Sequence, residues 1–107
     1  MLREEARSYC VELARFSAAK LKAGNEIWIA PSYPTIEFVA EQLRGSKIRV
    51  GAQSVHWKDS GAFTGEVSAP ILLEAGASFV ICGHSERRQF FGETDQTVSL
   101  RATTALQ

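Results

Sequence analysis

A short apolar run, Phe79–Cys82, ends at Gly83 and is followed at once by the polar cluster His84–Arg88, of sequence HSERR. Uninterrupted apolar runs of this length are typical of strands that are buried on both faces of a parallel sheet. In parallel α/β folds, the residues that carry out chemistry collect on the loops at the carboxyl ends of such strands. The sequence therefore predicts a parallel α/β fold with a functional site at His84.

The rest of the chain alternates helical and extended segments. The expected helices run from Leu2 to Ala23, from Ser32–Thr35 to Arg44, from Ser68 to Glu74, from Ser85 to Phe91 and from Thr94 to Leu106, and the expected strands are Glu26–Ala30, Lys47–Ala52 and Phe79–Cys82. Helical spacing predicts an inner face of the first helix that consists of Leu2, Ala6, Tyr9, Leu13, Phe16 and Leu21. Alternating units with right-handed crossovers place the three strands in one parallel sheet with all helices on one side.

Composition and charge restrict the function. The 107 residues suffice for one ordinary domain, and 12 Lys and Arg residues balance 12 Asp and Glu residues without a basic run, which argues against binding to nucleic acid or to an anionic membrane. No apolar segment of about 18 residues and no signal peptide is recognisable, so a cytoplasmic protein is expected. Cys10 and Cys82 belong to no CxxC pair and have no His at ligand spacing, so both are expected to be reduced and no metal is expected.

His84 is the main candidate for catalysis. Gly83 lets the backbone turn sharply, or lets a ligand approach closely, just before the imidazole. Ser85 is expected to cap a short helix, whose free N–H groups and partial positive charge disfavour the imidazolium form of His84. A neutral imidazole with one N–H group can act as an electrophile toward a substrate oxygen.

Simpler interpretations exist for the same segment. A single histidine after a strand is often only a hydrogen-bonding residue of a loop. Arg87 and Glu93 are then a structural ion pair that closes the loop. Phe90 and Phe91 are most simply residues of the core.

The longest irregular segment, Gln53–Val67, has an apolar tip. Phe63 stands between Gly61 and Gly65, and an exposed Phe needs a partner. On the residues alone, the simplest interpretation is that Phe63 folds back onto its own domain. His56, at the root of this loop, is expected to do no more than form hydrogen bonds.

Two motifs resemble triosephosphate isomerases. The stretch from Gly83 to Asp95, GHSERRQFFGETD, resembles the fourth-strand loop of that family, and Gly61–Glu66, GAFTGE, resembles the third loop by which the family forms dimers. Both matches are in order and at the family's spacing, and the similarity extends over essentially all 107 residues. The resemblance implies a partial TIM (β/α)8 barrel, in which residues 1–107 belong to a single barrel domain, since eight such units in about 250 residues close a complete barrel.

The resemblance also implies an activity. Members of the family are intramolecular oxidoreductases that interconvert dihydroxyacetone phosphate and D-glyceraldehyde 3-phosphate, in glycolysis and gluconeogenesis, through an enediol(ate) and without a cofactor. By resemblance, His84 moves a proton to and from the substrate oxygens, Glu86 forms hydrogen bonds near the substrate lysine, and Ser85 caps the helix and can contact the glutamate base. On the residues alone, Glu86 is equally well explained as a first-turn glutamate that the helix dipole stabilises. The family is itself a standard example of a histidine held neutral by a helix N-terminus, so the charge state expected for His84 is not independent of the resemblance.

Partners follow from the same resemblance. A homodimer is implied, with interface residues Phe63, Thr64, Gly65, Glu66, Gln53 and Arg87. In such a dimer Phe63 enters a pocket of the second subunit and Thr64 reaches toward the active site there. The substrate-binding Asn and Lys, the glutamate base, the lid and the phosphate loops of the family are expected outside Met1–Gln107. Two alternatives stay open, namely another phosphate-sugar barrel enzyme and a non-catalytic piece of a barrel that only associates.

Overall fold

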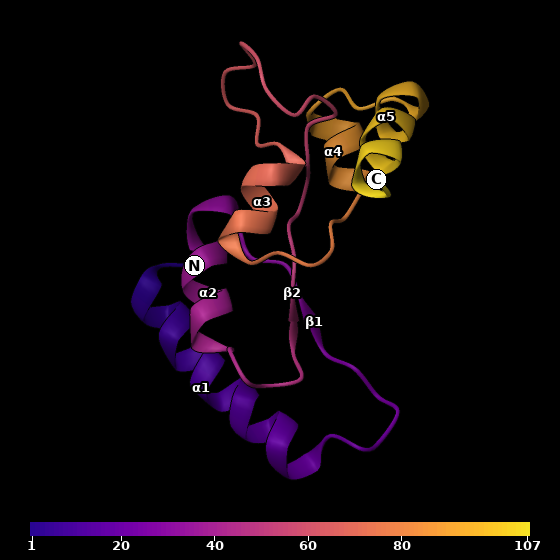
Figure 1. The fold of residues 1–107 in the computed structure, drawn as a ribbon. Coiled ribbons are helices and arrows are strands. Elements are labelled where there is room, and N and C mark those ends of the chain that lie inside the picture. The colour runs from indigo at the N-terminus through magenta and orange to yellow at the C-terminus, as the bar shows by residue number, and fades with distance from the viewer.

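A computed structural model describes all of residues 1–107. In chain order its elements are α1 (Arg3–Lys20), β1 (Trp28–Ile29), the 3-10 helix η1 (Tyr33–Thr35), α2 (Ile36–Gln42), β2 (Arg49–Val50), α3 (Ala69–Ala75), α4 (Ser85–Phe90) and α5 (Asp95–Ala105). Figure 1 shows α1, α2 and α3 along one side of the strands, while α4 and α5 lie together near the loop that projects between β2 and α3. The predicted alternation of helices and extended segments is confirmed. None of the helices combines the length and the apolar character that crossing a membrane requires.

The extended segments form a parallel sheet centred on β2. β1 pairs with β2 in parallel, with Trp28 opposite Arg49. On the other edge, the N–H group of Ala52 donates to the Phe79 carbonyl (3.0 Å), and the Ala52 carbonyl accepts from the N–H group of Ile81 (2.9 Å). The spatial order is therefore β1, β2 and the segment around Phe79, as expected for successive units of a parallel sheet.

The segment Phe79–Cys82 is less regular than predicted. It joins the sheet by a single parallel bridge between Val80 and Ala52. Val80 and Cys82 pack against the core, whereas Ile81 is 36% exposed. Successive side chains of an extended segment point to opposite faces, and helices cover only one face of this sheet. The prediction of a strand buried on both faces is therefore wrong here.

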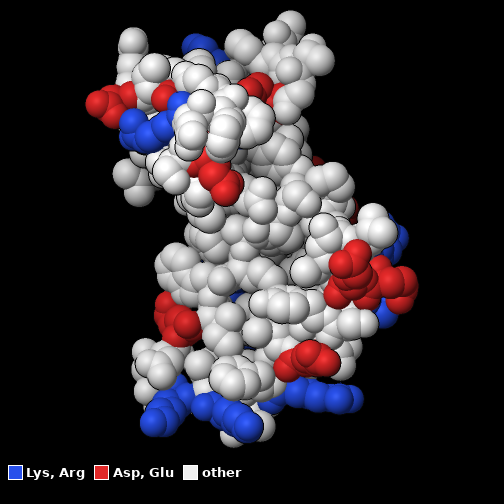
Figure 2. Space-filling model, turned by 180° about the vertical axis from the view of Figure 1, so that it is seen from behind, with Lys and Arg blue, Asp and Glu red and all other residues white.

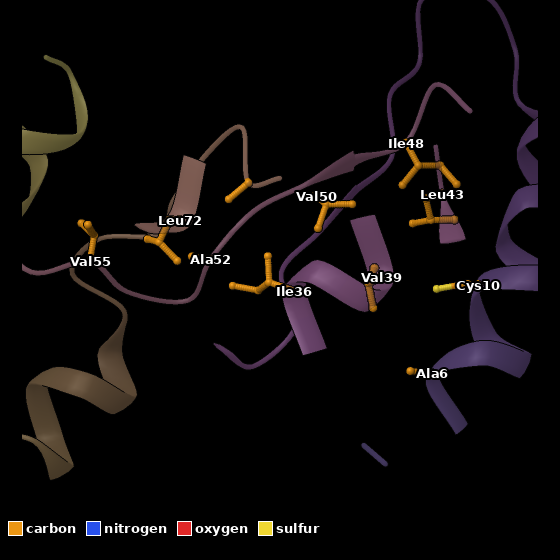
Figure 3. Close-up of a cluster of buried hydrophobic side chains, with 11 residues drawn as sticks. Ala6, Cys10, Ile36, Val39, Leu43, Ile48, Val50, Ala52, Val55 and Leu72 are labelled. Carbon is orange, nitrogen blue, oxygen red and sulfur yellow. The ribbon is translucent and has the colours of Figure 1, made fainter. Parts of the chain in front are cut away.

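The core is a row of apolar side chains between the helices and the sheet (Figure 3). Its members are Ala6, Cys10, Ile36, Val39, Leu43, Ile48, Val50, Ala52, Val55, Leu72 and Ala77. In this row α2 lies between α1 and α3. The buried stripe of α1 consists of Ala6 and Cys10, while Tyr9 and Phe16, which were predicted to face inward, are 46% and 50% exposed. Small residues at Ala6 and Cys10 let α1 approach α2 closely, which leaves the larger side chains at the edge of the contact.

The second face of the sheet carries aromatic side chains. The Phe79 and Trp28 rings lie 4.9 Å apart, and the Arg49 guanidinium lies 4.7 Å from the centre of the Trp28 ring. A Cβ atom at Gly51 would come within 2.6 Å of the Phe79 ring, so this glycine makes room for the aromatic contact. Seen from behind, the middle of the molecule carries almost no charged side chains (Figure 2). Trp28 is 51% exposed and Ile81 is 36% exposed, so apolar surface is left in contact with solvent.

Two aromatic residues at the end of α4 lie outside the core. Phe90 is 68% exposed and Phe91 is 66% exposed, so the prediction that they are core residues is wrong. α4 has six residues, and a helix of less than two turns offers little surface against which two adjacent rings can pack. Phe91 instead lies under the Arg87 guanidinium, 4.9 Å away.

The buried thiol of Cys10 provides a test of this packing. Cys10 is 2% exposed, and both cysteines are free. Burial raises the pKa of the Cys10 thiol above its ordinary value of 9.0, so the reactive thiolate is scarce in the folded chain. Because Cys82 is less deeply buried than Cys10, we expect iodoacetamide to label Cys82 faster in native buffer and to label both alike in urea. Equal labelling rates in native buffer, measured by peptide mass spectrometry, would contradict the packing of α1 against α2.

The raised pKa of Cys10 also makes stability depend on pH. The folded chain keeps this proton at a pH where the unfolded chain has lost it, so the contribution is fully present below pH 9.0 and is lost as the pH rises through the folded-state pKa. We expect the midpoint of urea unfolding to fall above about pH 9, and to fall less in the Cys10→Ala variant. A midpoint that falls equally in both proteins would show that Cys10 does not contribute.

The uncovered face of the sheet predicts association. Ile81 lies on this face, whereas Leu73, which is 70% exposed, lies on α3. We expect sedimentation velocity to show association that grows with concentration and that weakens in Ile81→Lys, because a buried contact would then have to desolvate a charge. The control Leu73→Lys should change it little. Equal effects of the two substitutions would place the contact elsewhere.

Candidate functional site

The polar cluster begins with a turn that favours glycine. Gly83 has a φ angle of +75°, in the left-handed region, and a Cβ atom there would lie 3.0 Å from a methyl group of Val98 in α5. Arg88 donates from Nε to the Gly83 carbonyl (3.1 Å) and from Nη1 to Asp95 (2.7 Å). The predicted turn before His84 is confirmed, and the first residue of α5 is tied to it.

His84, and not Ser85, caps α4. The N–H group of Glu86 donates to His84 Nδ1 (3.1 Å), and the His84 carbonyl accepts from the N–H groups of Arg87 (3.0 Å) and Arg88 (3.1 Å). The predicted cap at Ser85 is wrong because the imidazole already satisfies the free N–H group and Ser85 is the first helical residue. In a neutral imidazole one nitrogen accepts and the other donates, so an accepting Nδ1 leaves Nε2 as the donor.

A hollow of about 330 Å³ lies beside His84. Its lining residues are Ala30, Gln53, Ile81, His84, Glu86, Arg87 and Phe91. The hollow thus brings His84 and Glu86, predicted to be catalytic, together with Gln53 and Arg87, predicted for a dimer interface, while Ser85 does not line it. Gln53 donates to the Ala30 carbonyl (2.9 Å) across the ends of β1 and β2. Two larger hollows, of about 650 and 510 Å³, contain none of the predicted catalytic residues, so we assign the site to the smaller one.

Four charged side chains of alternating sign form a charge chain between α4, α5 and the loop, in the order Glu66, Arg101, Glu93 and Arg87. Arg87 pairs with Glu93, as predicted from the sequence. Arg101 lies 3.5 Å from Glu93 and 3.5 Å from Glu66. Its Nε atom and Glu93 Oε1 are close enough for an ion pair but make no hydrogen bond. Glu93 is 7% exposed and Arg101 is 6% exposed, so the centre of this charge chain is buried.

No sequence motif indicated Arg101, whose side chain is buried at the centre of the charge chain. Its guanidinium donates to the Val55 carbonyl (2.6 Å) and to the Ser54 hydroxyl (3.3 Å), and it lies 5.0 Å from the centre of the Trp57 ring. The available signal was its position three residues after Val98, which puts a charged side chain on the inner face of α5. Reaching so far into the molecule, Arg101 fixes the root of the loop to α5.

Two other ionisable groups near the charge chain hold their protons. Burial raises the pKa of the Tyr33 hydroxyl above its ordinary value of 10.0. Burial also raises the pKa of the Cys82 thiol above 9.0, the Glu93 carboxylate raises it further and Arg101 lowers it. Neither group is therefore a candidate base or nucleophile near neutral pH.

The loop Gly61–Glu66 projects from one end of the molecule (Figure 1). Phe63 is 42% exposed, and its ring lies 4.3 Å from the ring of His56. Phe63 thus folds partly back onto its own chain, as the residues alone suggested, and keeps an exposed side. The hydrogen bonds expected of His56 are not formed, since neither ring nitrogen has a hydrogen-bond partner in the protein. Its Nδ1 atom lies 3.8 Å from Glu66 Oε2, and the ring packs on Phe63 and Trp57.

Among the residues that line the hollow, His84 can supply an imidazole N–H group and Glu86 a carboxylate. Such a donor can stabilise negative charge that develops on a substrate oxygen and can exchange a proton with it. No three His, Cys, Asp or Glu side chains gather closely enough to hold a metal ion.

Known proteins resemble this chain in both sequence and structure. The triosephosphate isomerase family model matches residues 1–107. The triosephosphate isomerase of Synechococcus sp. (strain JA-2-3B'a(2-13)) is 50% identical over 104 residues, which are 94% of this chain and 42% of that protein. The Nostoc punctiforme enzyme is 52% identical over 82 residues, which are 77% of this chain and 34% of that protein. The crystal structure of triosephosphate isomerase from Bartonella henselae has a TM-score of 0.85 and 34% identity, with 95% of this chain and 41% of that chain covered.

These matches take in between 77% and 95% of this chain and less than half of each relative, so the chain spans between 34% and 42% of their lengths. The structural match confirms the predicted fold class, a partial TIM barrel with parallel strands and helices. The family model, which spans every residue, agrees with the two motifs around His84 and Phe63. The chain belongs to the triosephosphate isomerase family and represents part of its barrel.

Proposed function

We propose that this chain is part of an enzyme that interconverts dihydroxyacetone phosphate and D-glyceraldehyde 3-phosphate through an enediol(ate). The observation that carries the proposal is the hydrogen bond from the Glu86 N–H group to His84 Nδ1 (3.1 Å), beside a hollow lined from the ends of three sheet segments. This bond commits Nδ1 to accepting, so the Nε2–H group is available for the substrate oxygens. Residues 1–107 then belong to a single barrel domain that works in the cytoplasm, in glycolysis and gluconeogenesis, without a cofactor.

The role of His84 is proton transfer and charge stabilisation. As a base removes a proton from carbon, negative charge develops on the carbonyl oxygen, and an imidazole N–H group can stabilise it and pass a proton between the two oxygens. Glu86 is proposed to hydrogen-bond near the substrate lysine, and Ser85 to contact the glutamate base. We assign that lysine, the base and the phosphate loops to parts of the barrel other than residues 1–107.

The complete barrel is proposed to be a homodimer. The supporting observation is the projecting loop, whose tip residues are exposed although one of them is a phenylalanine. Its partner pocket belongs to the second subunit, with Thr64 directed toward the active site there. The proposed interface residues are Phe63, Thr64, Gly65, Glu66, Gln53 and Arg87.

Activity is best tested in a complete barrel. In a barrel chimera, residues 1–107 replace the matching segment of the Synechococcus relative. We expect the barrel chimera to isomerise both triose phosphates, and His84→Gln to lower kcat by about a hundredfold or more, because general acid catalysis typically contributes at least that much. An inactive but folded chimera, or a fully active His84→Gln variant, would contradict the proposed function.

A polypeptide of residues 1–107 alone serves as the counterpart. Without a base and a phosphate clamp it should show no turnover above background. Turnover by contaminating host enzyme is recognised because it remains in a preparation of the His84→Gln variant. Turnover that this substitution abolishes would show that the 107 residues contain a base the proposal lacks.

The interface proposal predicts a specific loss of dimer. In the barrel chimera, Phe63→Ala should raise the dimer dissociation constant, because an aromatic anchor in a partner pocket contributes more than its neighbours. Phe16→Ala, which removes a ring that is 50% exposed on α1, is the matched control and should leave the constant unchanged. Sedimentation equilibrium compares the two variants, and an unchanged Phe63→Ala dimer would remove Phe63 from the interface.

A further inference from the structure

The charge chain Glu66–Arg101–Glu93–Arg87 links three parts of the molecule. Glu66 ends the projecting loop, Arg101 belongs to α5, Glu93 precedes α5, and Arg87 belongs to α4. Only Arg101 contacts both acidic residues. Its Nη1 atom lies 3.5 Å from Glu66 and its Nε atom 3.5 Å from Glu93. Replacing Arg101 would therefore separate Glu66 from the Glu93–Arg87 ion pair.

The buried position of Arg101 makes the arrangement rigid. Its side chain is 7% exposed and that of Glu93 is 3% exposed. Buried charges must keep their partners, because an uncompensated charge in the interior is strongly unfavourable. The planar guanidinium also holds the Val55 carbonyl (2.6 Å), so it can shift only if the loop root shifts as well.

The chain ends on the helix that carries the imidazole. Glu93 holds Arg87 twice, by its carboxylate on the guanidinium and by its N–H group on the Arg87 carbonyl (3.2 Å). Arg87 in turn donates its N–H group to the His84 carbonyl (3.0 Å). The orientation of α4, and with it the direction of the His84 ring, is thus fixed through Glu93.

From this geometry we propose that Arg101 is a positioning residue for His84, acting through Glu93 and Arg87 and coupling α4 to the loop. Arg101 is not among the residues that line the hollow, so its effect on the rate must be indirect. The inference rests on the proposed function, because the direction of the ring matters for rate only if His84 acts on a substrate. A catalytic group displaced by about 1 Å can lose about a hundredfold in rate.

The test uses the barrel chimera with Arg101→Met, which keeps the length of the side chain and removes its charge. We expect kcat to fall about tenfold or more while KM changes less than about threefold, since the hollow itself is intact. The matched control is Thr104→Val, because Thr104 ties α5 to the same loop root through the Trp57 carbonyl (3.1 Å) without touching the charge chain. Its kcat should stay unchanged even if its melting temperature falls.

A second variant, Arg101→Lys, keeps the proposal testable if Arg101→Met does not fold. Lysine at this position keeps the charge but cannot reach Glu93 and Val55 together, so Arg101→Lys should fold and show a smaller loss of kcat. Nitrogen NMR adds a measurement that does not depend on turnover. In both Arg101 variants the His84 Nδ1 resonance should move toward that of an imidazole without the Glu86 hydrogen bond, and in Thr104→Val it should not.

The outcomes separate the two proposals. A folded barrel chimera without activity would contradict the proposed function. The NMR comparison would then decide whether Arg101 positions His84. An active chimera in which folded Arg101→Met or Arg101→Lys keeps both kcat and the His84 Nδ1 resonance overturns the positioning role alone. Equal losses of kcat in Thr104→Val and Arg101→Met would reduce Arg101 to a general contributor to stability and would also overturn the proposal.

Discussion

Hydrogen bonds along both edges of β2 determine where everything else lies. On one edge the N–H group of Arg49 donates to the Ile27 carbonyl (3.0 Å), and on the other the Val50 carbonyl accepts from the N–H group of Ser78 (2.8 Å). A strand paired on both edges aligns the carboxyl ends of its neighbours, so the loops that follow must meet at one edge of the sheet. The hollow beside His84 results from that alignment, because Ala30, Gln53 and Ile81, near the carboxyl ends of the three sheet segments, all line it.

Local signals in the sequence predicted the elements well. Thr94, the expected start of the last helix, caps α5, and Gly76 ends α3 in the left-handed conformation, because both residues act on their own neighbours. Burial was predicted less well, because it depends on what covers a face. Ile81 and Phe90 belong to apolar patterns, yet they are exposed since no described element packs on them. The role of Arg101 could not be predicted from its neighbours, because its contacts lie 46 and 47 residues away in the sequence.

The cap of α4 is a different residue from the one that the sequence predicted. The sequence indicated a helix N-terminus next to His84, with Ser85 as its cap, whereas His84 itself is the cap. One nitrogen of the ring therefore completes the backbone hydrogen bonding of α4, and the same bond selects the nitrogen that can donate. The proposed chemical role of His84 thus falls on a side chain that also has a structural role, so a replacement that cannot accept from the Glu86 N–H group also removes the cap of α4.

The contacts of Arg101 have a consequence for the order of folding. The β1–β2 pair with α2, and the turns at Gly76 and Gly83, bring together residues near in the chain, whereas Arg101 must find Val55 across 46 residues. Closing a long loop costs conformational entropy before any contact compensates for it. The docking of α5 is therefore expected to come after the folding nucleus has formed, so substitutions at Arg101 would speed unfolding more than they slow folding.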